Sequence, residues 1–265
     1  MPTITALFRH PVKGFTPESC ERLVVRPDGR VAGDRVLAFR FSDAVRPEQR
    51  DGHDYWPKRR GLSLMDFPTL AGLRLAFDED GGRVRIERAG RMLVDADLDE
   101  SGRRDLESAV TDYLLSGPDA RRLRADGVLP IRLVGDGRTP RFQDRAPGYV
   151  SLHGADSVAA VGTTTDAPID DRRFRSNIVI GGTVAWEELT WTDEVRIGEV
   201  RFAVVGPIER CTAIMAHPDT GERDAPLLRL LVSEFGQAAP TLGILLLPVD
   251  GGGTVRVGDP VGPAG

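Results

Sequence analysis

Residues 204–212 read Val204-Val205-Gly206-Pro207-Ile208-Glu209-Arg210-Cys211-Thr212 and place a cysteine directly after an arginine at the end of an apolar run. The chain has only two cysteines in 265 residues, so we do not expect a framework of structural disulfides. A thiolate beside a fixed positive charge is a nucleophile or a soft metal ligand. The alternative is that Cys211 is a small buried apolar residue, as many free cysteines are.

The segments around this stretch predict mainly β structure. Apolar and β-branched runs indicate a buried strand at 177–181, two strands at 194–198 and 199–205, and closing strands at 243–248 and 253–257. One helix is expected from Ala225 through Phe235, with Asp224 as its cap, Pro226 in its first turn and Gly236 after its end.

The first half of the chain is also rich in strand signals. Ile4, Ala6 and Phe8 are expected to face one way along a strand, and 73–77 and 83–87 flank the hairpin signal Asp80-Gly81-Gly82. A helix is predicted over 101–115, capped by Ser101. Two polar stretches, 43–61 and 135–148, are expected to be loops. We predict a β-rich α+β chain with short helices, and two domains at 1–120 and 121–265.

Composition limits the partners and the compartment. The net charge of −5 argues against nucleic acid as the main partner, because phosphate neutralisation needs a basic face. No apolar run approaches the ~20 residues that span a membrane, so no membrane contact is expected. The N-terminal residues lack the pattern of a signal peptide, and the low cysteine content fits a reducing cytoplasm.

Lysine is rare in this chain. Of 35 lysines and arginines, only Lys13 and Lys58 are lysine. Lys13 could make a compact point-charge contact with phosphate, although chance retention is an equal alternative. The four histidines show no zinc-site spacing. His153, on a loop before a short helix, is a candidate pocket residue, whereas His217 is expected in a turn.

Ordered segments of the C-terminal half resemble the MOSC domain, the C-terminal domain of molybdenum cofactor sulfurase. They are Phe174 to Ile180, Val195 to Val200, Pro207 to Cys211, Asp219 to Glu222 and Val255 to Val261. The first 80 residues resemble the β-barrel domain that often precedes it, through Pro11 to Gly14, Glu18 to Arg22 and Ala32 to Arg35. The resemblance implies a MOSC-type β-barrel core and an N-terminal β-barrel-like domain. The mitochondrial amidoxime-reducing component and its bacterial relatives have this arrangement.

The resemblance also implies a cofactor site. Cys211 would be the ligand of molybdenum in the molybdenum cofactor (Mo-molybdopterin), and Arg210 would keep its thiolate charged. The expected cofactor-binding residues are Lys13 and Arg35 near the phosphate, Arg175 and Asn177 on the pterin side, and Ser157, Arg210 and Thr212. The alternatives are that Lys13 and Arg35 are solvated strand-edge charges and that Asn177 caps a strand. Cys20 is expected in the core.

Three functions remain open at this point. The first is a molybdenum oxidoreductase that reduces an N-hydroxylated small molecule, with electrons from a separate electron-donor protein. The second is a sulfur carrier or sulfurtransferase that holds a persulfide on Cys211. The third is a carrier of the molybdenum cofactor without turnover. Gly14 stands where the amidoxime reducers tend to have a hydroxyl, and the loop from Arg46 to Arg60 matches no family segment, so the substrate is not predicted.

Overall fold

The computed structural model describes residues 1–50, 52–145 and 148–264. Its largest element is an eight-stranded sheet in which only β11 and β12 pair in parallel. The strands, in spatial order, are β17 (Val261–Pro263), β13 (Glu194–Ile197), β14 (Val200–Glu209), β15 (Thr241–Pro248), β11 (Val150–Gly154), β12 (Ile178–Gly181), β1 (Thr3–Arg9) and β2 (Glu18–Cys20). The predicted strand-rich α+β class is confirmed, but no pairing closes β17 onto β2 in the described ranges, so a closed barrel is not observed.

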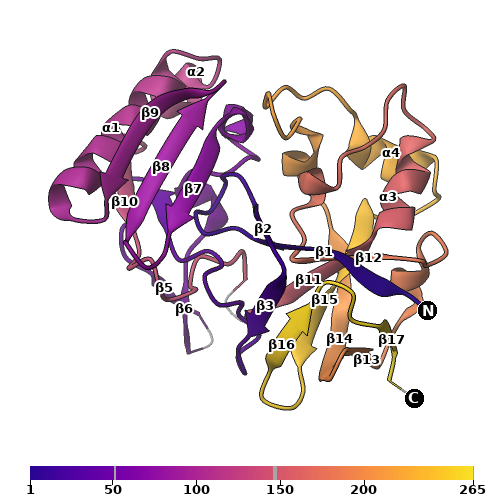
Figure 1. Cartoon of the computed structure of the whole chain (residues 1–265). Coiled ribbons are helices and arrows are strands. Elements are labelled where there is room, and N and C mark those ends of the chain that lie inside the picture. Colours follow the sequence, from indigo (N-terminus) through magenta and orange to yellow (C-terminus); the bar gives the residue numbers. More distant parts are fainter. Residues whose placement is uncertain (51, 146–147, 265) are drawn as a thin grey trace.

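Short helices cover the upper end of this sheet in Figure 1. They are α3 (Ala155–Gly162), α4 (Leu227–Ser233) and the 3₁₀ turns η3 (Asp171–Phe174) and η5 (Thr212–Met215), whereas a further 3₁₀ turn, η4 (Glu187–Thr190), packs through Leu189 against the core of the large sheet. Val161, Leu227 and Leu231 are fully buried in a cluster of their own, which holds these helices together without a long amphipathic face. Within the described ranges, none of the helices has both the length and the apolar character needed to span a membrane.

A second layer lies beside the large sheet, on the left in Figure 1. It consists of the antiparallel sheet β7 (Arg74–Asp78), β8 (Arg83–Arg88) and β9 (Arg91–Asp97), covered by α1 (Glu100–Leu115) and α2 (Ala120–Leu123). Leu106, Val110 and Leu114 recur every four residues on α1 and are buried, as predicted. The cap of α1 is Asp99, whose carboxylate accepts from the Gly102 N–H at 2.7 Å, so the prediction of Ser101 as the cap was wrong.

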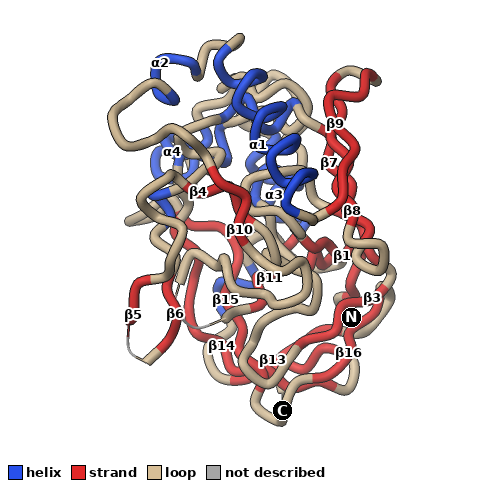
Figure 2. The backbone as a smooth tube through the Cα atoms, turned by 90° about the vertical axis from the view of Figure 1, so that its left-hand side faces the viewer, coloured by secondary structure: helices blue, strands red, loops and turns tan. Residues whose placement is uncertain are grey.

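Each of the two layers contains segments from both the N-terminal and the C-terminal part of the chain. The N-terminal strands β1 and β2 belong to the large sheet, and β3 (Arg22–Val25) pairs with β16 (Gly253–Arg256). In the opposite direction, β10 (Arg132–Val134) pairs with β4 (Ala38–Arg40), and Leu123 and Leu133 share a core cluster with residues of the first hundred. Both large core clusters therefore contain residues from before and after residue 120. Figure 2 shows β10 and β4 side by side in a second view.

Two further sequence predictions need correction. Ile4 and Leu7 are the buried residues of β1, not the expected set Ile4, Ala6 and Phe8, because a register shift between Ile4 and Ala6 rotates the strand. The predicted loop 43–61 contains the hairpin β5 (Glu48–Arg50) and β6 (His53–Tyr55) and the 3₁₀ turn η1 (Lys58–Arg60). A further 3₁₀ turn, η2 (Pro68–Gly72), follows it.

Candidate functional site

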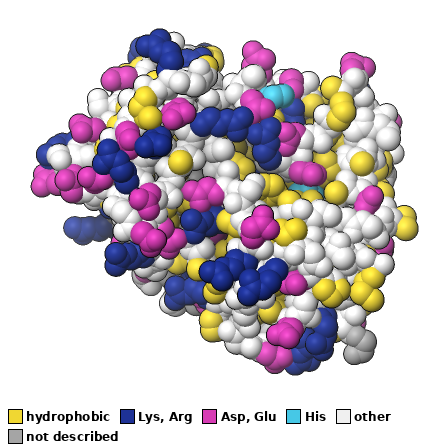
Figure 3. Space-filling view, in the orientation of Figure 1, with side chains coloured by type: hydrophobic (Ala, Val, Ile, Leu, Met, Phe, Trp, Pro, Cys, Tyr) yellow, Lys and Arg dark blue, Asp and Glu magenta, His cyan; other side chains and the backbone are white. Residues whose placement is uncertain are grey.

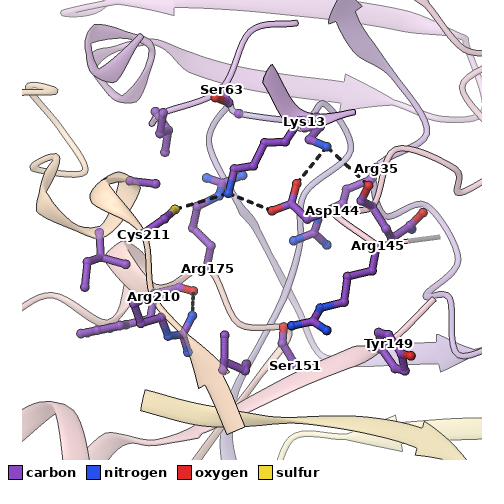
Figure 4. A pocket seen from close by; sticks show the side chains of 18 of the residues that line it. Lys13, Arg35, Ser63, Asp144, Arg145, Tyr149, Ser151, Arg175, Arg210 and Cys211 are labelled. Atoms are coloured by element: carbon purple, nitrogen blue, oxygen red, sulfur yellow. Dashed lines mark hydrogen bonds and ion pairs between the residues drawn. The ribbon is translucent and has the colours of Figure 1, made fainter. Parts of the chain in front are cut away.

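A cavity of about 500 Å³ lies where loops from both layers meet the end of β14. Its polar and charged lining residues come from distant parts of the chain and include Lys13, Arg35, Lys58, Asp144, Arg145, Arg175, Asn177, Arg210 and Cys211. Figure 4 shows Cys211 on one side of this cavity and Arg35 and Arg145 on the other. The structure therefore brings together six of the eight residues predicted from the sequence.

Cys211 follows β14 and immediately precedes η5 in extended conformation, which leaves its half-buried side chain on the cavity wall. Its sulfur accepts a hydrogen bond from the Lys58 ammonium group at 3.3 Å. Cys20, by contrast, packs partly buried against the core of the large sheet, as expected, and burial raises the pKa of its thiol. Cys211 is thus the cysteine that can take part in chemistry at the cavity.

Asp144 connects the two lysines of the chain. Its carboxylate lies 2.9 Å from the Lys13 ammonium group and 3.1 Å from that of Lys58 (Figure 4). Burial opposes ionisation of Asp144, but the two ammonium groups outweigh it and hold the pKa of this carboxyl well below its usual range. Burial also opposes the charge on Lys58, yet Asp144 and Cys211 together raise its pKa. For Lys13, burial dominates and lowers the pKa.

Arg35 and Arg175 are held by backbone conformations that non-glycine residues seldom adopt, with φ of 51° and 53°. Arg35 forms an ion pair with the buried Asp34, whose carboxylate also accepts a hydrogen bond from the backbone N–H of His10 at 2.6 Å. Arg175 donates to the Phe15 carbonyl at 2.8 Å. Burial, together with the charge of Arg35, lowers the pKa of Arg175 to about 10. Both guanidinium groups are fixed before any ligand binds.

Residues 142–262 match the MOSC domain family. The match covers a little less than half of the chain. The resemblance predicted from the sequence is confirmed for this part of the chain.

Curated relatives match over shorter stretches. A 75-residue stretch, 28% of this chain, is 41% identical to the molybdenum cofactor sulfurase of Bos taurus but spans only 8% of that protein. A 115-residue stretch, 40% of this chain, is 36% identical to the mitochondrial amidoxime reducing component 2 of Rattus norvegicus and spans 33% of it. The crystal structure of the YUAD protein from Bacillus subtilis aligns over 98% of this chain and 94% of its own, with 10% identity and a TM-score of 0.45.

The MOSC domain supplies only part of the cavity wall. Cys211, Asp144 and Arg175 belong to it, whereas Arg35 and the two lysines precede it in the sequence. Among the described residues, seven cationic side chains but only two acidic ones, Asp144 and Glu209, line the cavity. Two of the cations have acidic partners outside the cavity lining: Arg173 pairs with Asp224 at 2.8 Å, and Arg35 pairs with Asp34. The cavity therefore has an excess of positive charge, although the chain as a whole is acidic.

Arg210 lines the cavity, but its hydrogen bonds go to the backbone and not to the neighbouring sulfur. Its guanidinium donates to the carbonyls of Leu242 at 2.7 Å and Phe174 at 2.8 Å, and it lies over the Phe174 ring. Burial lowers the pKa of Arg210 to about 9. The charge of Cys211 acts against this shift, so Arg210 and Cys211 interact electrostatically, whereas the hydrogen bond to the sulfur comes from Lys58.

Asn177 lines the cavity with both ends of its amide already engaged. Its oxygen accepts from the backbone and the hydroxyl of Ser151 at 3.3 and 2.9 Å, and its nitrogen donates to the Phe8 carbonyl at 3.2 Å. This arrangement matches the alternative considered from the sequence, in which Asn177 caps a strand, because it fixes the start of β12 between β11 and β1.

Ser157 and Thr212 of the MOSC domain do not line the cavity. Ser157 is fully buried. Its hydroxyl donates to the Glu188 carboxylate at 2.8 Å and accepts from the backbone N–H of Trp186, so its hydrogen-bonding groups are used within the fold. Thr212 begins η5. His153 is also buried away from the cavity, with Nε2 at 3.3 Å from a carboxylate oxygen of Asp171.

Sequence reasoning missed Lys58, Asp144 and Arg145 as cavity residues. The only signal was the scarcity of lysine, which applies to Lys58 as much as to Lys13. Asp144 and Arg145 lie in the stretch 135–148, which the sequence marks only as a polar loop. Their role becomes visible only when the fold places this loop opposite Cys211.

Proposed function

We propose that the chain binds the molybdenum cofactor with Cys211 as the metal ligand and reduces N-hydroxylated compounds. The observation that carries this proposal is the position of the Cys211 sulfur in the same cavity as an excess of cationic side chains. The names of the relatives, a molybdenum cofactor sulfurase and an amidoxime reducing component, support a function related to this cofactor.

The donor set fits the cofactor. A thiolate is a soft ligand that suits molybdenum already held by sulfur, and lysine and arginine suit a terminal phosphate. Lys13, Arg35 and Arg175 all line the cavity, and the charge of Arg35 acts on both of the others. A cavity volume of about 500 Å³ is within the range for cofactor sites. When bound, the cofactor would supply two-electron transfer at the metal.

The protein would contribute ligation, orientation and charge. The substrate R–NH–OH takes up two electrons and two protons, its N–O bond breaks, an N–H bond forms, and R–NH₂ and water leave. The electrons would come in single steps from a separate electron-donor protein. Lys58 would hold the Cys211 side chain toward the cavity through its hydrogen bond, while Asp144 fixes Lys58. We place this reaction in the cytoplasm, where the two free cysteines would stay reduced.

Sulfur transfer is the second candidate. The hydrogen bond from Lys58 to the Cys211 sulfur would equally suit a persulfide at this position. A persulfide carrier needs no phosphate site, however, and the cation-rich wall formed by Lys13, Arg35 and Arg175 would then have no use.

Elemental analysis separates these functions. The chain, Cys211→Ser and the control Cys20→Ser would be expressed in a host that makes the cofactor. We expect stoichiometric molybdenum, and the fluorescence of the oxidised pterin, in the wild type and in Cys20→Ser but not in Cys211→Ser. Reduction of an N-hydroxylated compound with an artificial electron donor would then separate an enzyme from a carrier. A protein without molybdenum whose Cys211 has gained the mass of one sulfur atom would instead support sulfur transfer.

A further inference from the structure

We propose that Lys58 binds an anionic group of the substrate beside Cys211, so that the site prefers N-hydroxylated compounds that carry a carboxylate. This inference rests on the proposed function and adds a substrate class to it. It assigns a role in specificity to a residue outside the MOSC domain, in a loop that matches no segment of the family.

The Lys58 ammonium group has a donor to spare. An ammonium group has three N–H donors, and two of them serve the Cys211 sulfur at 3.3 Å and the Asp144 carboxylate at 3.1 Å. In the described part of the chain, these are the only hydrogen-bond or ion-pair partners of Lys58. Its side chain is 26% exposed, so the remaining donor is accessible from the cavity.

The charges around Lys58 also leave room for an anion. A single carboxylate, Asp144, serves both Lys58 and Lys13. The two ammonium groups therefore share one carboxylate, so Lys13, Lys58 and Asp144 together carry a net positive charge. A carboxylate of a ligand would neutralise it through a charge-assisted hydrogen bond.

The two lysines occupy different positions in the cavity, so Lys13 can bind the cofactor phosphate while Lys58 binds the substrate carboxylate. Lys13 is 8% exposed, binds the other oxygen of Asp144 and lies within 3.5 Å of the Gln143 carbonyl, away from the sulfur. Lys58 contacts the sulfur itself. A phosphate held by Lys13 and Arg35 would therefore leave Lys58 at the reacting end of the cavity, where the substrate must bind.

The backbone that carries Lys58 is anchored by its neighbours. Trp56 is buried against Phe142, with ring centroids 4.8 Å apart, and the buried Arg40 donates to the Pro57 carbonyl at 2.9 Å. This anchoring fixes the start of η1, so Lys58 enters the cavity from a rigid support although it belongs to a loop. A preorganised charge of this kind loses little entropy when it binds a ligand.

The test compares Lys58→Met with Arg59→Met in the molybdenum-loaded protein. Arg59 is the exposed next residue and does not line the cavity, so its variant makes the same change in charge outside the site. The substrates are benzamidoxime and 4-carboxybenzamidoxime, which differ only in the carboxylate. Calorimetric binding of benzoate to the same three proteins gives a readout that does not depend on reduction.

We expect Lys58→Met to lower the ratio of kcat/KM for the carboxylated over the neutral compound at least about tenfold and to weaken benzoate binding by a similar factor. Arg59→Met should leave the ratio within about twofold of the wild type, as for a surface charge. Equal effects on both compounds, unchanged benzoate binding, or loss of molybdenum from Lys58→Met would each overturn the proposal; the last result would assign Lys58 to the cofactor. If neither compound is reduced, the proposed reaction fails, and benzoate binding alone decides the anion site.

Discussion

The Lys58 ammonium group donates a hydrogen bond to the Cys211 sulfur across a sequence separation of 153 residues. The two residues are far apart in the chain, since Lys58 begins the 3₁₀ turn η1 and Cys211 directly precedes η5. Asp144 holds Lys58 from the other side and links it to Lys13. Replacement of any of these side chains should therefore alter the hydrogen bonding and the charge around the sulfur.

Replacement of Cys211 by serine should remove molybdenum and activity while the fold persists. The two side chains are close in size and Cys211 is only half-buried, so we expect the free energy of unfolding to change by less than about 1 kcal/mol. Metal content and urea denaturation of the same preparation check both parts. A Cys211→Ser protein with wild-type molybdenum content would remove Cys211 from the metal site.

Arg35→Ala should weaken retention of the cofactor by about 1–3 kcal/mol, because a charge-assisted contact is lost from a fixed guanidinium group. The measurement is the molybdenum that remains after extended dialysis. Arg22→Ala is the control, since Arg22 is exposed on β3 and does not line the cavity. Equal retention by both variants would show that Arg35 holds only Asp34.

Asp224→Asn should destabilise the protein by about 1–2 kcal/mol, because it removes the counter-charge of the almost fully buried Arg173. Asp224 itself is 40% exposed, which keeps the loss below that for a fully buried pair. The exposed pair Arg104–Glu100 on α1 provides the comparison, and Glu100→Gln should cost no more than about 0.5 kcal/mol. Urea denaturation measures both; similar losses would contradict the assignment.

Stability should fall as the pH drops below neutrality, because His10 is fully buried. Burial, together with the charge of Arg175, lowers the pKa of His10 from 6.5 to about 3. The unfolded chain then binds a proton that the folded chain excludes, so the free energy of unfolding should decrease by about 2 kcal/mol between pH 7 and 5. His153 is shifted in the same direction by burial and adds to the slope.

His10→Gln isolates this contribution. The variant should show a shallower dependence on pH than the wild type between pH 7 and 5, as measured by urea denaturation at several pH values. Asp34 does not interfere, because its pKa is lowered to about 2 and its stabilisation is lost only as the pH falls from about 4 through 2. Identical slopes in both proteins would show that His10 titrates normally.

Local patterns predicted the elements that depend on neighbours in sequence. The spacing of Leu106, Val110 and Leu114 was sufficient for α1, and the glycine turn was sufficient for the β7–β8 hairpin. The prediction of a helix cap failed where the capping residue instead binds a residue that is distant in the sequence. Asp224 was predicted to cap α4, but its carboxylate binds Arg173, and α4 begins only at Leu227 without a side-chain cap.

The sequence predicted the site residues that belong to family motifs, but it did not predict those that only the folding of the chain brings to the cavity. Six predicted residues line the cavity, among them Cys211 and Lys13. Lys58 and Asp144 were missed because their roles depend on loops that approach each other in space. Arg210 was assigned to Cys211 because the two are adjacent in sequence, but the donors of its guanidinium bind backbone carbonyls, so it acts on the cysteine through its charge alone.

The insertion of β1 between β12 and β2 has a consequence for any attempt to produce the MOSC segment separately. A fragment of residues 142–262 would expose the full hydrogen-bonding edge of β12 to solvent. Such bare edges recruit further strands and lead to aggregation. The isolated fragment would also lack both lysines of the cavity. In the whole chain, β1 occupies this edge of β12 and so protects the sheet that leads to the cysteine from pairing with other molecules.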